Sequence, residues 1–198
     1  MLLIVGLGNP GPRYEYTRHN AGFLAAGRLA AKAGFPPPAR FRQSLIAHGL
    51  TAEARIVLAW PQTYMNLSGQ AVLELAAFYK IPDRDILVLH DEMDLPPGRL
   101  KLSIGGGPAG HRGLCSILEF LKADFCRLKI GIGRPGPAEG EAADYVLDRF
   151  SSQEWPLVDE TLDRAAEAAL TWAERGLGLA QNLVNRRPDP APDRVAHA

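Results

Sequence analysis

The sequence predicts a single α/β domain in which a twisted, mixed β-sheet is flanked by helices. Short apolar segments typical of strands alternate along the chain with longer segments of helical periodicity. Two neighbouring strand-like segments form a hairpin, which adds antiparallel pairing to an otherwise parallel pattern. The 198 residues show no internal repeat and no linker between two cores, and a 46% hydrophobic share is enough to bury one core.

Caps and helix-breaking residues place the individual elements. Asn20 and Ser68 are residues that can cap helices; Gly34 and the prolines at 36–38 end the first helical segment, and the second stops before Pro82. The strand segments are continuous apolar or alternating runs. In chain order we expect a strand at residues 2–7, a helix from 20 to about 33, a hairpin of 44–50 and 55–60, a helix from 68 to before Pro82, strands at 86–89 and 99–104, a helix from about 111 to 122, a strand at 127–132 and a long helix near 152–175.

The boundaries and cellular location follow from what flanks these elements. Residues 1–185 are expected to form the folded domain, with a mobile loop at 134–143, and the proline-rich residues 186–198 are expected to be a disordered tail. Runs of about 18 apolar residues are absent, so no membrane partner is expected. The N-terminus lacks a basic signal region, and Cys115 and Cys126 form no redox or metal motif. Reduced thiols in a cytoplasmic protein are therefore the simplest interpretation.

Charge is unevenly distributed although the net charge is zero. Residues 1–134 carry 16 Lys and Arg against 10 Asp and Glu, whereas residues 135–175 carry 3 against 10. A basic body with an acidic later segment would suit a polyanionic ligand. The solvated face of an acidic helix accounts for the same pattern, and charge alone favours this simpler interpretation.

The segment from Gly6 to Gly11 fits the G-x-G-x-x-G pattern of a dinucleotide-binding turn and follows a strand. Three features argue against a nucleotide cofactor. Pro12 gives a poor start for the required helix, and the polar Asn9 occupies the loop. The acidic residue expected about 20 residues later for the ribose is missing. The glycines are then best explained as turning the chain sharply, and no organic cofactor is expected.

Polar side chains follow two of the predicted buried strands. Asn9 follows the first strand, and Asp91 follows the strand that ends at residue 89. Active sites of open α/β sheets lie beyond the carboxyl ends of strands. His19 and Asn66 lie on neighbouring loops, so one base, one carboxylate and two carboxamides are available for a site.

These residue types together suit hydrolysis by an activated water. A neutral imidazole takes a proton from water near pH 7, and a carboxylate bonded to its other nitrogen fixes the tautomer. Carboxamides can hold an ester or peptide group and support an oxyanion. Because no Ser-centred nucleophile elbow is present, water is the expected nucleophile.

Structural roles remain open for each of these residues. His19 could cap a helix or lie on the surface, Asp91 could cap a turn, Asn66 could start a helix, and His90 could be a buried residue at a strand end. The cluster of His90, Asp91, Glu92 and Asp94 could also bind a metal. Adjacent residues of an extended segment point to alternate faces, however, and no further histidine has ligand-like spacing. No metal is therefore expected.

Several long, collinear motifs resemble those of the bacterial peptidyl-tRNA hydrolase family. They cover about residues 1–180: 5–11 (VGLGNPG), Tyr14, 17–22 (TRHNAG), 61–69 (PQTYMNLSG), 90–98 (HDEMDLPPG), 105–107 (GGG), 110–114 (GHRGL) and 128–135 (LKIGIGRP). The resemblance implies one α/β catalytic domain that hydrolyses the ester bond of peptidyl-tRNA with water, releasing the peptide and recycling tRNA for translation. It implies a cytoplasmic monomer that needs no metal or organic cofactor.

The resemblance also implies roles for individual residues. His19 would be the general base with Asp91 as its partner, and Asn9 would sense whether the amino group is blocked by a peptide bond. The residues expected to contact the aminoacyl group or the acceptor end of the tRNA are Tyr14, Tyr64, Met65, Asn66, His111, Arg112, Lys101 and Lys129.

This sequence departs from the usual family pattern at the expected tRNA surface. Arg112 and Ser103 stand where members often have Asn and Lys, and some members have Arg in place of Lys129. We also expect some of the five cations Lys101, Arg112, Arg127, Lys129 and Arg134 to meet phosphates of the acceptor stem.

Two other functions remain to be separated from hydrolysis. One is RNA binding without hydrolysis, by a protein similar to the plant chloroplast intron-splicing factors, which would need a basic surface but no working site. The other is a nucleotide-dependent oxidoreductase, which the missing acidic residue disfavours. Hydrolysis of N-blocked aminoacyl-tRNA, assayed beside unblocked aminoacyl-tRNA and NAD binding, separates the three.

Overall fold

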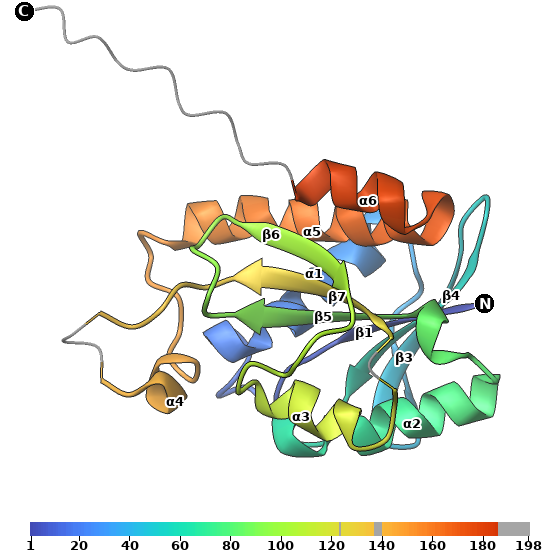
Figure 1. Ribbon diagram of the computed structural model, residues 1–198, viewed down its shortest axis with the longest axis horizontal. Helices are drawn as coiled ribbons and strands as arrows, with labels where there is room; N and C mark the ends of the chain where they lie inside the picture. The colour runs from blue at the N-terminus through green and yellow to red at the C-terminus, as the bar shows by residue number, and fades with distance from the viewer. Residues whose placement is uncertain (123, 137–139, 186–198) are drawn as a thin grey trace, which may run out of the picture.

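The computed structural model describes residues 1–122, 124–136 and 140–185, which form a seven-stranded mixed sheet flanked by helices (Figure 1). The strand order is β2-β3-β4-β1-β5-β7-β6. The four central strands are parallel: β1 (Leu2–Gly6), β4 (Arg55–Pro61), β5 (Ile86–Glu92) and β7 (Cys126–Gly131). The three others pair antiparallel with their neighbours: β2 (Ala39–Phe41), β3 (Ser44–Leu50) and β6 (Leu100–Ile104). The predicted fold class is therefore confirmed.

Helices cover both faces of the sheet. On one face lie α1 (Ala21–Lys32) and α5 (Trp155–Arg175), and on the other lie α2 (Ser68–Tyr79) and α3 (Arg112–Leu118) (Figure 1). The shorter helices are α4 (Ala142–Tyr145), α6 (Leu177–Val184), which packs on α5 and β6, and the 3-10 turns η1 (Arg18–Asn20), η2 (Met65–Leu67) and η3 (Asp83–Asp85).

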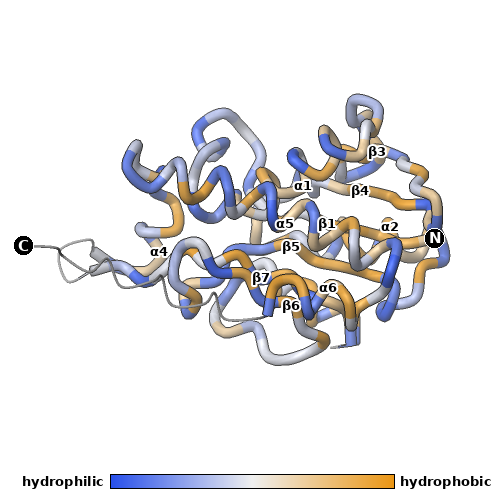
Figure 2. Tube along the Cα trace, turned by 90° about the horizontal axis from the view of Figure 1, so that it is seen from above, coloured by the Kyte–Doolittle hydropathy of each residue, from blue (hydrophilic) through white to orange (hydrophobic). Residues whose placement is uncertain are grey.

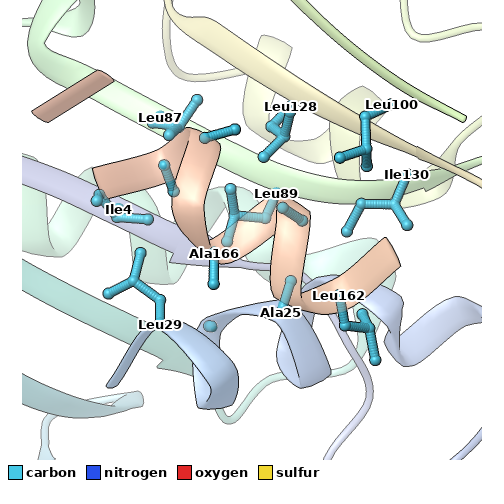
Figure 3. Packing of buried hydrophobic residues seen from close by; sticks show 14 of the residues in the cluster. Ile4, Ala25, Leu29, Leu87, Leu89, Leu100, Leu128, Ile130, Leu162 and Ala166 are labelled. Carbon is cyan, nitrogen blue, oxygen red and sulfur yellow. The ribbon is translucent and has the colours of Figure 1, made fainter. Parts of the chain in front are cut away.

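Each face of the sheet has its own apolar core. On the α1–α5 face, Leu87, Leu89 and Leu128 of the strands pack against Ala25 of α1 and Leu162 of α5 (Figure 3). Small alanines on both helices let them approach the strands and each other closely. Strands β4 and β5 consist mainly of apolar residues, whereas hydrophilic and hydrophobic residues alternate along α5 (Figure 2). No helix among the described residues is long and apolar enough to cross a membrane.

Several boundaries differ from the sequence expectations, for physical reasons. Strand β5 continues through His90 and Asp91 to Glu92, because these residues pair with β7 and are buried between neighbouring strands. Neither predicted cap acts as one. The Asn20 side chain bonds to Asn9 instead, and the Ser68 hydroxyl donates to the Met65 carbonyl in the preceding turn η2.

Other elements were missed or too long in the sequence prediction. The short strand β2 and the helices α4 and α6 were not expected, and α6 lies directly beyond the helix-breaking Gly176. Helix α3 ends at Leu118, short of the predicted residue 122, and α5 begins at Trp155 rather than near 152. Within the expected mobile loop at 134–143, residues 137–139 lie outside the described residues, as does the expected tail at 186–198.

Helix α1 touches the strand ends through glycines. A methyl group at Gly22 would lie 2.5 Å from the Leu7 nitrogen and closer still to the Leu89 carbonyl oxygen. Gly6 is equally tight, because its own Cβ would overlap the Gly22 carbonyl. The contact continues in hydrogen bonds, since the Phe23 N–H donates to the Leu7 carbonyl at 3.0 Å. The start of α1 is thereby held against β1 and β5.

Replacing Gly22 by alanine should lower the free energy of unfolding by about 1–3 kcal/mol, because the new methyl group meets backbone that cannot move aside. Gly27→Ala on the same helix is the matched control. A Cβ there meets nothing within 4 Å, so the gain in helix propensity should raise stability by about 0.5–1 kcal/mol. Urea unfolding measures both, and equal stability of the two variants would contradict the close contact.

Candidate active site

A cleft of about 580 Å³ opens at the carboxyl ends of β1, β4 and β5. Its floor holds buried polar side chains of the strand ends, and residues of α4 form one wall. It is lined by nine of the residues predicted from sequence: Asn9, Tyr14, His19, Tyr64, Met65, Asn66, Asp91, His111 and Arg112. Lys101 and Lys129 do not line it. The parallel strands thus bring together residues that are up to 103 positions apart in the sequence.

The carboxylate of Asp91 lies at the centre of the polar floor and is shared by two imidazoles. The Nδ1 atom of His19 lies 2.9 Å from Asp91 Oδ1 and 3.0 Å from Oδ2. The Nε2 atom of His111 lies 2.9 Å from the same Oδ1. All three side chains are almost completely buried. The predicted hydrogen-bonded pair of His19 and Asp91 is therefore present, with His111 as a third member.

The tautomer of each histidine follows from its partners. His111 is the N-cap of α3, and its Nδ1 accepts from the backbone N–H groups of Gly113 and Leu114 at 3.2 and 3.3 Å. The ring proton of His111 must then be on Nε2, which donates it to Asp91. Asp91 likewise takes the Nδ1–H of His19, so Nε2 of His19 is left as an acceptor. This is the arrangement that a general base requires.

Burial and the neighbouring charges set the protonation of this group. Burial alone would lower the pKa of His19, but the charge of Asp91 and its hydrogen bond outweigh that effect and raise the pKa above its ordinary value. The charge of Arg112 opposes the rise. For Asp91, burial would raise the pKa, yet His19 and His111 hold it far below its usual range. Asp91 is therefore a carboxylate at any working pH.

For His90, the structure supports the structural role left open by the sequence, that of a buried residue at a strand end. It is fully buried on the α3 side of β5, its Nδ1–H donates to the Asp91 carbonyl at 2.6 Å, and its ring packs edge-on against His111. Burial and the proximity of His111 lower the pKa of His90 to about 3, so it stays neutral. It leaves the negative charge of Asp91 to His19 and His111.

The two asparagines near the start of the chain form one unit. Asn20 accepts from the Asn9 N–H at 2.8 Å and donates to the Asn9 carbonyl at 3.0 Å, which fixes the backbone of the loop. The Met65 N–H donates to Oδ1 of Asn9 at 2.8 Å, which fixes its side chain. The Nδ2 donor of Asn9 is used in none of the hydrogen bonds found between described residues. The exposed Asn66, on the neighbouring turn η2, lines the same cleft.

The expected cationic surface is present only in part. Lys101 and Lys129 are register partners on β6 and β7, so they share one face, and that face is opposite to the apolar residues packed on α5. Lys129 Nζ lies 2.6 Å from Oε2 of Glu92, and Arg134 bonds to Asp94. Lys101 and Arg112 are exposed.

Arg127 does not belong to this surface. It has no exposed area, its Nη1–H donates to the Gly107 carbonyl at 2.8 Å, and its guanidinium lies over the Phe125 ring. Of the five cations from which some were expected to meet phosphates, Arg127 is therefore not accessible in this conformation, because it is buried against the glycine loop at 105–107. The phosphate contacts themselves stay a prediction.

A metal could be considered where His19, Asp91 and His111 converge, since their candidate ligand atoms lie within 4.8 Å of one another. The hydrogen bonds argue for a different use of these atoms. His111 Nε2 carries a proton as long as two backbone N–H groups point at Nδ1, and a protonated nitrogen is no ligand. The cluster of residues 90–94 considered from sequence does not converge in this way. The absence of a metal stays a prediction.

Two contributions to the site were missed in the sequence. The sequence predicts only a helix cap at Asn20 and no role for Arg18. The Arg18 guanidinium lies 4.2 Å from the centre of the Tyr145 ring and forms a two-pronged ion pair with Glu154. The His19 N–H donates to the Val146 carbonyl at 2.8 Å. These three contacts tie the His19 turn to α4 and to the segment that follows it. Both residues stand beside His19 in the TRHNAG motif, which was the available signal.

Replacing Asp91 by asparagine should lower the pKa of His19 below that of a free histidine, about 6.5. The variant removes the two effects that raise the pKa and leaves burial and Arg112, which lower it. Arg112→Ala should have the opposite effect and raise the pKa further. NMR titration of the His19 ring measures both shifts, and a pKa that does not move in Asp91→Asn would exclude the pairing.

The comparisons with known proteins agree with this geometry. Residues 3–191 match the family described as peptidyl-tRNA hydrolase. Peptidyl-tRNA hydrolase of Moorella thermoacetica is 50% identical over 187 residues, 93% of this chain and 98% of that protein. The protein of the same name from Desulfitobacterium hafniense is 48% identical over 187 residues, 94% of this chain and 100% of its own length.

A solved structure extends the agreement to three dimensions. The crystal structure of a peptidyl-tRNA hydrolase in complex with N-propanol superposes with a TM-score of 0.88 at 38% identity, covering 96% of this chain and 97% of that one. The similarity therefore extends from the sequence to the three-dimensional arrangement of almost the whole chain. The chain belongs to the peptidyl-tRNA hydrolase family.

Proposed function

We propose that this protein hydrolyses the ester bond between peptide and tRNA in peptidyl-tRNA, and that His19 activates the attacking water. The observation that carries the proposal is the acceptor nitrogen of His19, held in the cleft by a buried Asp91 that His111 also supports. An RNA-binding protein without activity would not need this nitrogen. Residues 1–185 would form the catalytic domain.

The reaction needs one proton acceptor that later returns its proton. Nε2 of His19 takes a proton from water as the water oxygen attacks the ester carbonyl carbon. The tetrahedral intermediate then collapses, the bond to the ribose oxygen breaks, and the imidazolium gives its proton to that oxygen. The products are the peptide carboxylic acid and tRNA with a free hydroxyl. Asp91 stabilises the imidazolium in between.

Asn9 would recognise the blocked amino group. Its Oδ1 is occupied by the Met65 N–H, so it presents Nδ2 as a donor. A peptide or an N-acyl group offers a carbonyl oxygen to this donor, whereas unblocked aminoacyl-tRNA offers a donating ammonium instead. Asn66 would donate to the oxyanion. Tyr14, Tyr64 and Met65 would contact the aminoacyl side chain and the terminal nucleotide.

The proposal involves a single chain acting in the cytoplasm without a metal or organic cofactor. Every group named in the reaction belongs to one cleft of one chain. Water, the imidazole and the carboxamides account for the proton transfers and the developing charge. The proposed partner is the acceptor end of peptidyl-tRNA.

Asn9→Ala should narrow the difference between N-acetyl-aminoacyl-tRNA and unblocked aminoacyl-tRNA. The parent chain should prefer the blocked substrate, and loss of the Nδ2 donor should lower kcat/KM for that substrate by about tenfold to a hundredfold, the effect of one hydrogen bond in a desolvated site. Release of tRNA from each substrate measures the ratio.

His19→Ala is the control for this experiment, because it should remove most cleavage of both substrates without unfolding the protein. An unchanged ratio in Asn9→Ala would remove the role assigned to Asn9. A parent chain that binds tRNA but cleaves neither substrate would support the RNA-binding alternative instead.

Arg112 and Lys101 provide the sharper test of the proposed tRNA surface. Removal of Lys129 would leave the buried Glu92 without its ion pair. A Lys129 variant could therefore lose activity through lower stability as well as through weaker tRNA binding. In Arg112→Ala and Lys101→Ala, KM should rise more than kcat falls, and the salt dependence of kcat/KM should flatten by roughly one counterion per contact. Cleavage measured between low and high salt shows this. Arg84→Ala, an exposed cation beyond α2, serves as the control that should leave both quantities unchanged.

A further inference from the structure

A second concavity lies beside the cleft, on the α1 side of the sheet. It is a groove of about 820 Å³ between α1, the start of α5 and the β3–β4 hairpin. Its walls are mostly apolar and aromatic, formed by Tyr16, Phe23, Leu24, Trp60 and Trp155. None of the residues assigned to the reaction lies in it except Asn9, and the proposed function gives it no role.

The groove continues the cleft rather than standing apart from it. Asn9 lines both cavities. The β4–η2 connection also passes from one to the other, since Gln62 lines the groove and Tyr64 the cleft. The same holds for Tyr14 in the cleft and Tyr16 in the groove. Three separate segments thus border both spaces, and they meet at the side chain proposed to hold the peptide carbonyl.

Charge indicates what kind of chain the groove accepts. The charged residues in its lining are Glu15 and Arg28. Arg28 is already paired with Asp159 and Asp163 of the acidic helix α5. The remaining charge is negative, which repels phosphodiesters. The exposed Lys101, by contrast, lies on the opposite face of the sheet from α5. RNA is therefore disfavoured in the groove, and an uncharged, apolar chain is favoured.

Gly27 keeps the groove open. It lies inside α1, where glycine weakens a helix, and its φ is not in the left-handed region. Gly22 in the same helix is required by backbone contact, but a Cβ at Gly27 would meet no atom within 4 Å. Because Gly27 lines the groove, any larger side chain there would project into its space.

We propose that the groove on the α1 side is a subsite for the residues of the nascent peptide that precede the ester-linked residue, with a preference for apolar and aromatic side chains. The inference rests on the proposed hydrolysis of peptidyl-tRNA. The peptide would leave the cleft past Asn9, cross the loop at 10–12 and lay its side chains against Tyr16, Trp60 and Trp155. The subsite makes peptide length and composition determinants of specificity.

The test compares two substrates with the same ester-linked leucine. One is N-acetyl-leucyl-tRNA, which ends at Asn9, and the other is a hexapeptidyl-tRNA with Leu and Phe at the preceding positions. The parent chain should cleave the longer substrate with a kcat/KM about tenfold higher, the effect of burying roughly one apolar side chain. In Gly27→Phe, the kcat/KM values for the two substrates should differ by no more than about twofold. Cleavage of N-acetyl-leucyl-tRNA should be unchanged in this variant.

Matched variants keep the result interpretable. Gly178→Phe places the same ring on an exposed glycine of α6, where a Cβ also meets nothing within 4 Å, and should not change the ratio. Gly27→Leu, a smaller obstruction, should give an intermediate ratio and serves if the phenylalanine variant folds poorly. Thermal unfolding checks that each variant is folded.

The outcomes separate this inference from the function on which it rests. A parent chain that does not cleave N-acetyl-leucyl-tRNA with dependence on His19 would overturn both. Cleavage with no effect of peptide length, or an equal loss for both substrates in the folded Gly27→Phe and Gly27→Leu variants, would overturn the subsite alone. Weaker inhibition of Gly27→Phe by deacylated tRNA would show that the groove holds RNA instead of peptide.

Discussion

The close approach of α1 to the ends of β1 and β5 determines where the reactive groups lie. Gly6 and Gly22 allow backbone to touch backbone, and no larger side chain fits between them. His19 precedes this contact by three residues, and Asp91 follows Leu89, which is part of it, by two. The contact therefore sets the separation of imidazole and carboxylate before any hydrogen bond forms. The 2.9 Å bond between them then adds orientation to a distance that packing has already fixed.

A buried carboxylate imposes the second constraint. Asp91 is 3% exposed, and a charge at that depth is tolerated only with strong partners. Two imidazole donors provide them, and each is fixed from elsewhere: His19 by its backbone bond to Val146, and His111 by the first N–H groups of α3. His111 thus caps the start of α3 and also holds Asp91. Stability and chemistry share their hydrogen bonds here, so changes to His111 would affect both.

The fold separates the acidic and basic parts of the sequence onto different faces of the sheet. Five of the acidic residues of this segment lie on α5, which covers one face of the sheet, while Lys101 and Lys129 lie on the opposite face of β6 and β7. A substrate that is RNA at one end and peptide at the other suits such a molecule, with the cleft at the boundary. Lys129 is partly neutralised by Glu92, and Arg127 is covered, so fewer cations are available than the count in the sequence suggests.

The sequence by itself determined the fold class, the order of the main elements, the family and nine of the residues that line the cleft. Periodicity and strand-end position are local properties, and the motifs of this family are long. Only the tertiary structure decided which side chains serve others. Asn20 holds the Asn9 loop rather than capping a helix, and His111 supports Asp91. Arg18 joins the His19 turn to Glu154. Arg127 is buried, although its alternation with Lys129 along the strand predicts a surface cation. Each of these outcomes depends on contacts between segments distant in the chain or on the closing of a loop over a side chain. No pattern along a single strand or helix contains that information, because local spacing says which way a side chain points but not what meets it.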